Sequence, residues 1–159
     1  PWGVLAGHLL EWAKLLVLLG RARPGGWAIP AAERFFAAAT DRAGDDEFGG
    51  FLYSFGLDGR IVDDRKYHWV IAEAIGAAAT LWLATGDDAY RGWYDRCWDW
   101  ALAHQIDRER GGWWPGLARD GSRIELPFAP GKPELYHPLG ACLGPLAWLE
   151  DAGGAPAGQ

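Results

Sequence analysis

The sequence predicts an all-α fold in which helices follow one another in pairs, with short β-hairpin loops between them. Five segments place apolar residues at helical spacing, so helices are expected to dominate the chain. Two loops end alike, in Leu57-Asp58-Gly59-Arg60 and in Arg119-Asp120-Gly121-Ser122. Recurrence after about 60 residues is typical of a helix-pair repeat. Five helices in this layout would form roughly half of a toroid of helix pairs.

Local signals give each element its expected bounds. Pro30 suits the first turn of a helix, Asp58-Gly59 is typical of a hairpin turn, and Asp87 or Asp88 can cap the helix that follows. In chain order we expect helix 5–21, a helix from Pro30 that ends before 44–50, a hairpin of 51–55 with 60–62, helix 67–85, helix 89–106, a hairpin of 112–117 with 119–123, and a helix from 134 or 136 to 151. Residues 1–151 are therefore expected to form one domain, and the small polar residues 152–159 a disordered tail.

Composition and charge exclude several classes of protein. The formal net charge of -6 comes without a basic stripe, which disfavours a nucleic acid partner. The longest apolar stretch, residues 15–19, is too short to span a membrane, and we expect a cytoplasmic location. Cys97 and Cys142 lie in apolar helical patterns and are expected to be small buried hydrophobes. The sequence indicates no cofactor, and it is compatible with a homodimer.

Tryptophan is the unusual residue of this chain, with 11 Trp and no Met. A core does not need so many indoles, so we expect some of them to line a cavity. A flat apolar ring with one polar N–H suits the C–H face of a sugar. Trp69, Trp113 and Trp114 are the candidates, either as core residues or as sugar platforms.

Two histidines near opposite ends of the chain carry the chemical hypothesis. His8 lies in Gly7-His8-Leu9-Leu10-Glu11-Trp12, and His137 opens the last helix directly before Pro138. Imidazole exchanges protons near neutral pH, so two of them facing one pocket could move a proton off and onto a carbon acid. Glu11 follows His8 by one helical turn and could fix the orientation of its ring. Plain structural roles, a solvated His–Glu pair and a helix cap, are also compatible with these positions.

The apolar pattern around Glu73 singles out its carboxylate. A carboxylate in such a run must be paired or reach a cavity. Pairing with Arg65 or Lys66 is as compatible with the sequence as contact with a ligand. His68 is a weaker candidate for the pocket, and His104 is expected to be a helix C-terminal histidine.

Four motifs together resemble the N-acylglucosamine 2-epimerase family, which also includes cellobiose 2-epimerase, mannose isomerase and sulfoquinovose isomerase. They occur in family order at residues 7–12, 66–74, 111–114 and 132–137, and cover nearly the whole chain. The resemblance implies an (α/α)6 barrel, of which this chain would be the C-terminal half.

The same resemblance implies roles for individual residues. His8 and His137 would be the acid/base pair, with Glu11 supporting His8, and proton transfer would need no metal. The ring-opened sugar would pass through a cis-enediol or enolate intermediate. Contacts to the substrate would come from Glu11, Trp69, Glu73 and Trp114.

Two departures from the family pattern bear on the substrate. His68 stands where the family commonly has tryptophan, and Pro138 follows the last histidine in a segment where cellobiose epimerases tend to place an arginine. The segment 138–142 and the pair Glu11-Trp12 are closer to the mannose isomerase branch, so aldose–ketose isomerisation is the first hypothesis. A 2-epimerase of N-acylglucosamine or of cellobiose-type sugars is the alternative.

Three further hypotheses are compatible with the sequence. A glycoside hydrolase would use Glu11 and Glu73 as its two carboxyl groups. A non-catalytic module would bind sugar on the tryptophan-rich face, and a metal site of His8, Glu11 and His137 is chemically conceivable. The isolated chain is expected to lack polar groups that an N-terminal half supplies in the family, and could be inactive alone.

Overall fold

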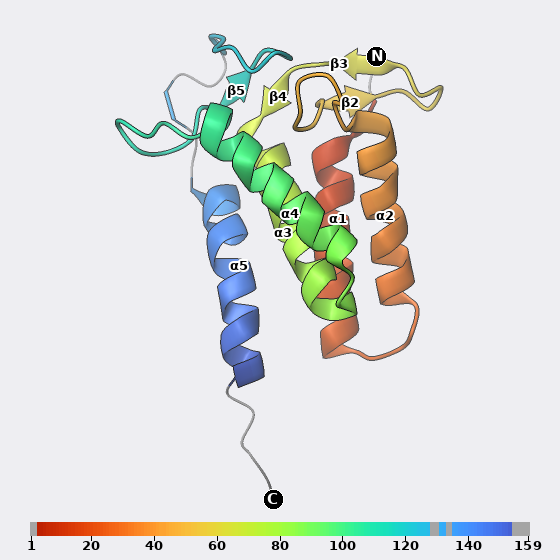
Figure 1. The fold of residues 1–159 in the computed structure, drawn as a ribbon. Helices are drawn as coiled ribbons and strands as arrows, with labels where there is room; N and C mark the ends of the chain where they lie inside the picture. The colour runs from red at the N-terminus through yellow and green to blue at the C-terminus, as the bar shows by residue number, and fades with distance from the viewer. Residues whose placement is uncertain (1–2, 128–130, 133–134, 154–159) are drawn as a thin grey trace, which may run out of the picture.

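The computed structural model describes residues 3–127, 131–132 and 135–153. Its helices are α1 (Ala6–Ala22), α2 (Ala28–Ala43), α3 (His68–Thr85), α4 (Asp88–Trp100), the short π-helix η1 (Ala101–Gln105) and α5 (Tyr136–Gly153). In Figure 1, α1, α3 and α5 run in one direction, whereas α2 and α4 run back. Consecutive helices therefore alternate in direction, and the predicted all-α, paired layout is confirmed for this part of the chain.

Helix α3 is the centre of the packing, because α1, α4 and α5 all lie against it. Every residue from 70 to 81 is buried, as the apolar pattern predicts. Small side chains, among them Gly76, Ala77 and Ala78, let the neighbouring helices approach closely. The rest of the core comes mainly from one face of α1 and of α2, including Leu10, Val17 and Phe36.

Short strands cover the end of the helices at which α1 and α3 begin (Figure 1). β1 (Val4–Leu5), β2 (Ser54–Phe55) and β3 (Ile61–Asp63) form an antiparallel sheet in that order. The predicted hairpin of 51–55 with 60–62 is confirmed in its β2–β3 part. Strand β1 was not predicted, because a two-residue strand is too short to show alternation.

The second predicted hairpin is wrong in its main pairing. β5 (Gly116–Leu117) pairs with β4 (Lys66–Tyr67), a strand far away in the sequence. Only a single bridge, between Leu117 and Arg123, connects the two predicted arms. The β4–β5 ladder ties the loop before α5 to the start of α3.

Several expected bounds also need correction. Helix α2 begins at Ala28, so Pro30 is its third residue, still in the first turn, where its missing N–H costs no bond. The helix from 89 begins at Asp88 with Asp87 as its N-cap, and its last turn is the π-helix η1. Helix α5 continues through Gly153, two residues past its expected end, and residues 154–159 of the expected tail lie outside the described residues.

A buried ion cluster holds the loop after α2 against β4. Lys66 Nζ lies 2.9 Å from Asp45 Oδ2 and donates to the carbonyl of Gly49, while Arg119 Nη2 lies 3.0 Å from Asp45 Oδ1. Burial alone would raise the pKa of Asp45, but hydrogen bonds from Arg119 and Lys66 outweigh it and lower the pKa to about 2. Burial lowers the pKa of Lys66. Because Lys66 lies two residues before the start of α3, this cluster fixes where the first residues of α3 lie.

The cysteines differ in their environment. Cys97 is buried, as predicted, and its burial raises the pKa of the thiol to about 12. Cys142 is exposed on α5, so the expectation of burial is wrong for this residue. In the described part of the chain, no helix combines the length and apolar character needed to cross a bilayer.

Candidate active site

Three histidines stand at the starts of three parallel helices. His8 is the third residue of α1, His68 the first of α3 and His137 the second of α5. Because α1 and α5 both pack against α3, these residues gather at one end of the helical layer. An open pocket of ≈ 380 Å³ is lined there by His8, Glu11, His68, Trp69, Tyr136 and His137. The structure thus brings the two predicted acid/base histidines into one concavity, together with Glu11 and Trp69.

Trp69 is the side chain against which both histidines pack. Its ring centroid lies 5.3 Å from that of His8 and 5.7 Å from that of His137. The ring reaches the backbone of α1 at Gly7, where an added Cβ would lie 2.5 Å from Trp69 Cη2 and closer still to Cζ3. Only glycine at position 7 leaves room for this approach. The glycine of the His8 motif is therefore explained by the position of Trp69.

A buried carboxylate orients His137. The Nδ1 atom of His137 lies 2.8 Å from Glu73 Oε1, and Lys14 Nζ lies 2.5 Å from Glu73 Oε2. The Glu73 side chain is 1% exposed, against 21% for His137. Pairing of Glu73 with Arg65 or Lys66 is excluded, because Arg65 pairs with Asp63 and Lys66 with Asp45.

This geometry selects one neutral form of the His137 ring. An ionised carboxylate can only accept a hydrogen bond, so it favours the tautomer with the proton on Nδ1. Nε2 then carries a free lone pair and can act as a general base. Glu73, whose two oxygens face His137 and Lys14, does not line the pocket, so its geometry fits a positioning role better than the predicted substrate contact.

Among the described residues, His8 has no such carboxylate partner. Glu11 lines the same pocket, yet among the described residues no hydrogen bond or ion pair joins its carboxylate to the His8 ring. The predicted support of His8 by Glu11 is therefore not seen in this structure. His8 is exposed, and its one ring neighbour described here is Trp69.

His68, the weaker candidate, is also part of the pocket. Its Nδ1 lies 3.2 Å from the carbonyl oxygen of Pro115, just before β5. Its ring lies edge-on to His137, with centroids 6.4 Å apart. The β4–β5 pairing thus fixes a third imidazole beside the predicted pair, a placement that no local sequence signal contains.

Trp114 lies away from the histidines. It lines a separate hollow of ≈ 590 Å³, where the Arg123 guanidinium lies 4.1 Å and Lys132 Nζ 4.7 Å from the centroid of its ring. Trp113 is buried in the core. Of the predicted sugar platforms, Trp69 is therefore the one that stands beside the histidines.

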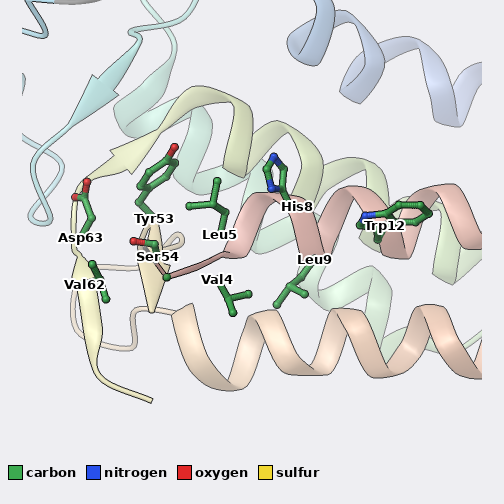
Figure 2. A pocket seen from close by; sticks show the side chains of 10 residues that line it. Val4, Leu5, His8, Leu9, Trp12, Tyr53, Ser54, Val62 and Asp63 are labelled. Atoms are coloured by element: carbon green, nitrogen blue, oxygen red, sulfur yellow. The ribbon is translucent and has the colours of Figure 1, made fainter. Parts of the chain in front are cut away.

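A larger hollow of ≈ 600 Å³ also has His8 in its lining (Figure 2). His8 and Trp12 contribute to it from α1, and Tyr53 and Asp63 from the neighbouring strand segments. Burial and the nearby Asp63 raise the pKa of Tyr53, while Arg65 lowers that of Asp63 by hydrogen bonding. Sequence reasoning missed Tyr53 and Asp63, which carry no motif. Among the described residues, no group of three His, Cys, Asp or Glu side chains is arranged to hold a metal ion.

Comparison with known proteins identifies the family. The family model described as N-acylglucosamine 2-epimerase (GlcNAc 2-epimerase) matches residues 1–141. The chain belongs to the N-acylglucosamine 2-epimerase family. This confirms the resemblance carried by the four motifs.

Individual relatives agree with this family. A D-mannose isomerase of Thermobifida fusca is 41% identical over 151 residues, which cover 92% of this chain and 37% of that protein. A crystal structure of D-mannose isomerase superposes with a TM-score of 0.87 at 36% identity, over 93% of this chain and 38% of that one. The structure of cellobiose 2-epimerase from Spirochaeta thermophila shares the fold, with a TM-score of 0.77 at 20% identity over 96% and 39% of the two chains. The chain thus spans little more than a third of the length of the relatives it matches.

Proposed function

We propose that this chain contributes the acid/base pair His8 and His137 to a sugar isomerase or epimerase. The observation that carries the proposal is the common pocket, in which both imidazoles pack against the Trp69 ring. Membership of the family supports the reaction class. In the proposed enzyme this chain is part of a complete (α/α)6 ring. Its match to 37–38% of the length of longer relatives is consistent with such a part.

The proposed reaction is a proton transfer on the open-chain sugar. Nε2 of His137 takes the proton from C2, the electron pair forms the C1=C2 double bond, and the carbonyl oxygen O1 takes up a proton to give a cis-enediol. For the ketose, a proton is returned to C1 while the O2 hydroxyl loses its own. For the epimer, a proton returns to C2 from the other face while the O1 hydroxyl loses its own. We assign the C2 proton to His137 because the Glu73 contact holds a proton on its Nδ1 and leaves Nε2 free to accept one.

Helix geometry supports this chemistry electrostatically. The positive ends of α1, α3 and α5 point to the pocket, since His8, His68 and His137 all belong to first turns. Negative charge that develops on O1 and O2 in the transition state is stabilised by such oriented dipoles. His68 and Glu11 add polar groups beside these oxygens, and Trp69 offers a flat apolar face to the sugar carbons.

Aldose–ketose isomerisation of a mannose-type sugar is the preferred outcome. The support for it is the identity of 36–41% to D-mannose isomerases. Epimerisation at C2 of N-acylglucosamine or of a cellobiose-type sugar is the alternative, because it shares every step up to the enediol. The two differ only in the carbon that receives the proton.

Hydrolysis of a glycoside is less compatible with the site. It requires two carboxyl groups that reach the scissile bond from opposite sides. Of the two candidates, Glu73 is 1% exposed and lies between Lys14 and His137. A sugar-binding module without catalysis would still bind sugar after the loss of both histidines, whereas the proposed enzyme would lose turnover.

The test is an assay of a full-length protein that contains this chain, with D-mannose, N-acetylglucosamine and cellobiose as substrates. Formation of fructose from mannose supports isomerisation, and glucose supports epimerisation. His8→Asn and His137→Asn are each expected to lower kcat by roughly 10²- to 10⁴-fold, the usual contribution of a general acid or base. His104→Asn is the matched control, because His104 stacks on Trp100 outside the pocket. Turnover that survives both pocket substitutions would overturn the proposal.

A further inference from the structure

We propose that Lys14 is a positioning residue of this site, which holds His137 in its base-competent tautomer through the Glu73 carboxylate. The inference rests on the proposed function only in its kinetic consequence. The structural part concerns the ring of His137 and can be measured without any turnover.

The three side chains form a continuous chain across the parallel helices. Lys14 comes from α1, Glu73 from α3 and His137 from α5. Each carboxylate oxygen serves one neighbour, with Oε2 at 2.5 Å from Lys14 Nζ and Oε1 at 2.8 Å from His137 Nδ1. No other hydrogen bond or ion pair reaches the Glu73 carboxylate from the described residues.

The fold makes room for the lysine. Its stem lies across α3 at Gly76, where an added Cβ would stand 3.1 Å from Lys14 Cδ. Even a single Cβ at position 76 would require the lysine stem to shift by a few tenths of an ångström. Lys14 is 17% exposed, so its head is largely shielded from water. The small residue Gly76 on α3 thus leaves space for the stem of Lys14, whose shielded ammonium lies beside the Glu73 carboxylate.

The charge of Lys14 decides what Glu73 can do. A carboxylate that is 1% exposed needs a compensating charge beside it, and Lys14 supplies this charge at Oε2. Without the ammonium, Oε2 loses this partner, and the carboxylate is no longer held with Oε1 against Nδ1 of His137. The hydrogen bond that keeps the His137 proton on Nδ1 is then weakened, and the tautomer with the proton on Nε2, which has no lone pair there to abstract a proton from carbon, gains population.

Lys14 does not line the pocket of the histidines, which separates its effect from substrate binding. Loss of its charge is therefore expected to lower kcat and leave KM nearly unchanged. A fall of roughly 10- to 100-fold is expected, smaller than the effect of a wrongly fixed tautomer in a catalytic triad.

The decisive experiment reads the tautomer of His137 directly, by ¹⁵N NMR of the imidazole nitrogens in the 159-residue chain. His137→Asn identifies the resonances. In the unmodified chain we expect a protonated Nδ1 and a free Nε2 at neutral pH. Lys14→Met is expected to reverse this pattern, and Lys14→Arg to restore it. Lys14→Gln, which keeps a donor but not the charge, serves the same purpose if Lys14→Met does not fold, as judged by circular dichroism.

Arg21→Met is the matched control, because it removes another cation from α1 that lies over Trp148. It is expected to leave the His137 tautomer unchanged. An Nδ1-protonated His137 in folded Lys14→Met and Lys14→Gln would overturn this inference and leave the proposed function intact. Absence of turnover by the unmodified full-length protein would instead refute the proposed function, while the tautomer result would still stand.

Discussion

The contact between Gly7 and Trp69 leads to a prediction that can be worked through quantitatively. In Gly7→Ala the new Cβ would lie 2.5 Å from Trp69 Cη2, whereas ordinary contacts begin at 3.4 Å. Because Cζ3 would lie closer still, the indole ring must recede from α1 by more than about 1 Å. Both histidine rings pack against it, so the spacing of the acid/base pair changes with it.

Two opposing effects act on the stability of this variant. Alanine in a helix is favoured over glycine by about 0.5–1 kcal/mol. Overpacking a filled site typically costs about 1–3 kcal/mol. We expect a net loss of stability on the order of 1–2 kcal/mol, measured by urea unfolding of the chain. A 1 Å misplacement of catalytic groups can cost about 100-fold, so kcat/KM of a full-length protein is expected to fall by that order.

Gly92→Ala provides the matched control. Gly92 is also helical, but an added Cβ there meets only the end of Arg96 at 3.6 Å, an ordinary contact. This variant is expected to be neutral or slightly stabilised, with unchanged turnover. If Gly7→Ala behaves as Gly92→Ala does in both assays, the reasoning about the Trp69 contact is refuted.

Three further predictions concern the ion cluster and the thiols. Asp45→Asn leaves Lys66 buried without its counter-charge, and urea unfolding should show a loss of about 3–5 kcal/mol; a loss below 1 kcal/mol would contradict the cluster's role. Folding lowers the pKa of Asp45 from 3.8 to about 2, which gives about 2 kcal/mol of stability. This stability is present above pH 3.8 and is lost as pH falls through 2. Urea unfolding measured from pH 5 to 2 should show this loss in the unmodified chain and not in Asp45→Asn. Iodoacetamide should label Cys142 in the native chain and Cys97 only after unfolding, and equal labelling rates would show that Cys97 is not buried.

The helices and their order could be predicted from the sequence because their signals are local. Apolar residues at helical spacing define α1, and the uninterrupted apolar run of α3 predicts its burial. Pro30 and Asp87 mark helix starts within two residues. His8 and His137 stood out for the same reason, since each lies in a distinctive motif at the start of a helix.

What the sequence did not reveal depends on contacts between distant segments. The pairing of β4 with β5 joins residues about 50 positions apart, and no local pattern encodes such a register. The neighbours of Glu73 in sequence suggested Arg65 or Lys66, but those cations already pair with Asp63 and Asp45. The true partner, Lys14, lies on another helix. Trp114 was singled out by residue type alone, and the path of its loop takes it away from the histidines.

Deuterium exchange tests most directly whether His8 and His137 together move the proton at C1 and C2 of one sugar. A full-length protein that contains this chain is incubated with D-mannose in D₂O, and deuterium at C1 and C2 of the recovered sugars is measured by NMR. The account predicts deuterium on the product carbon with the unmodified protein, and its loss in both His8→Asn and His137→Asn. Deuterium incorporation that persists at the original rate in either variant would contradict the account.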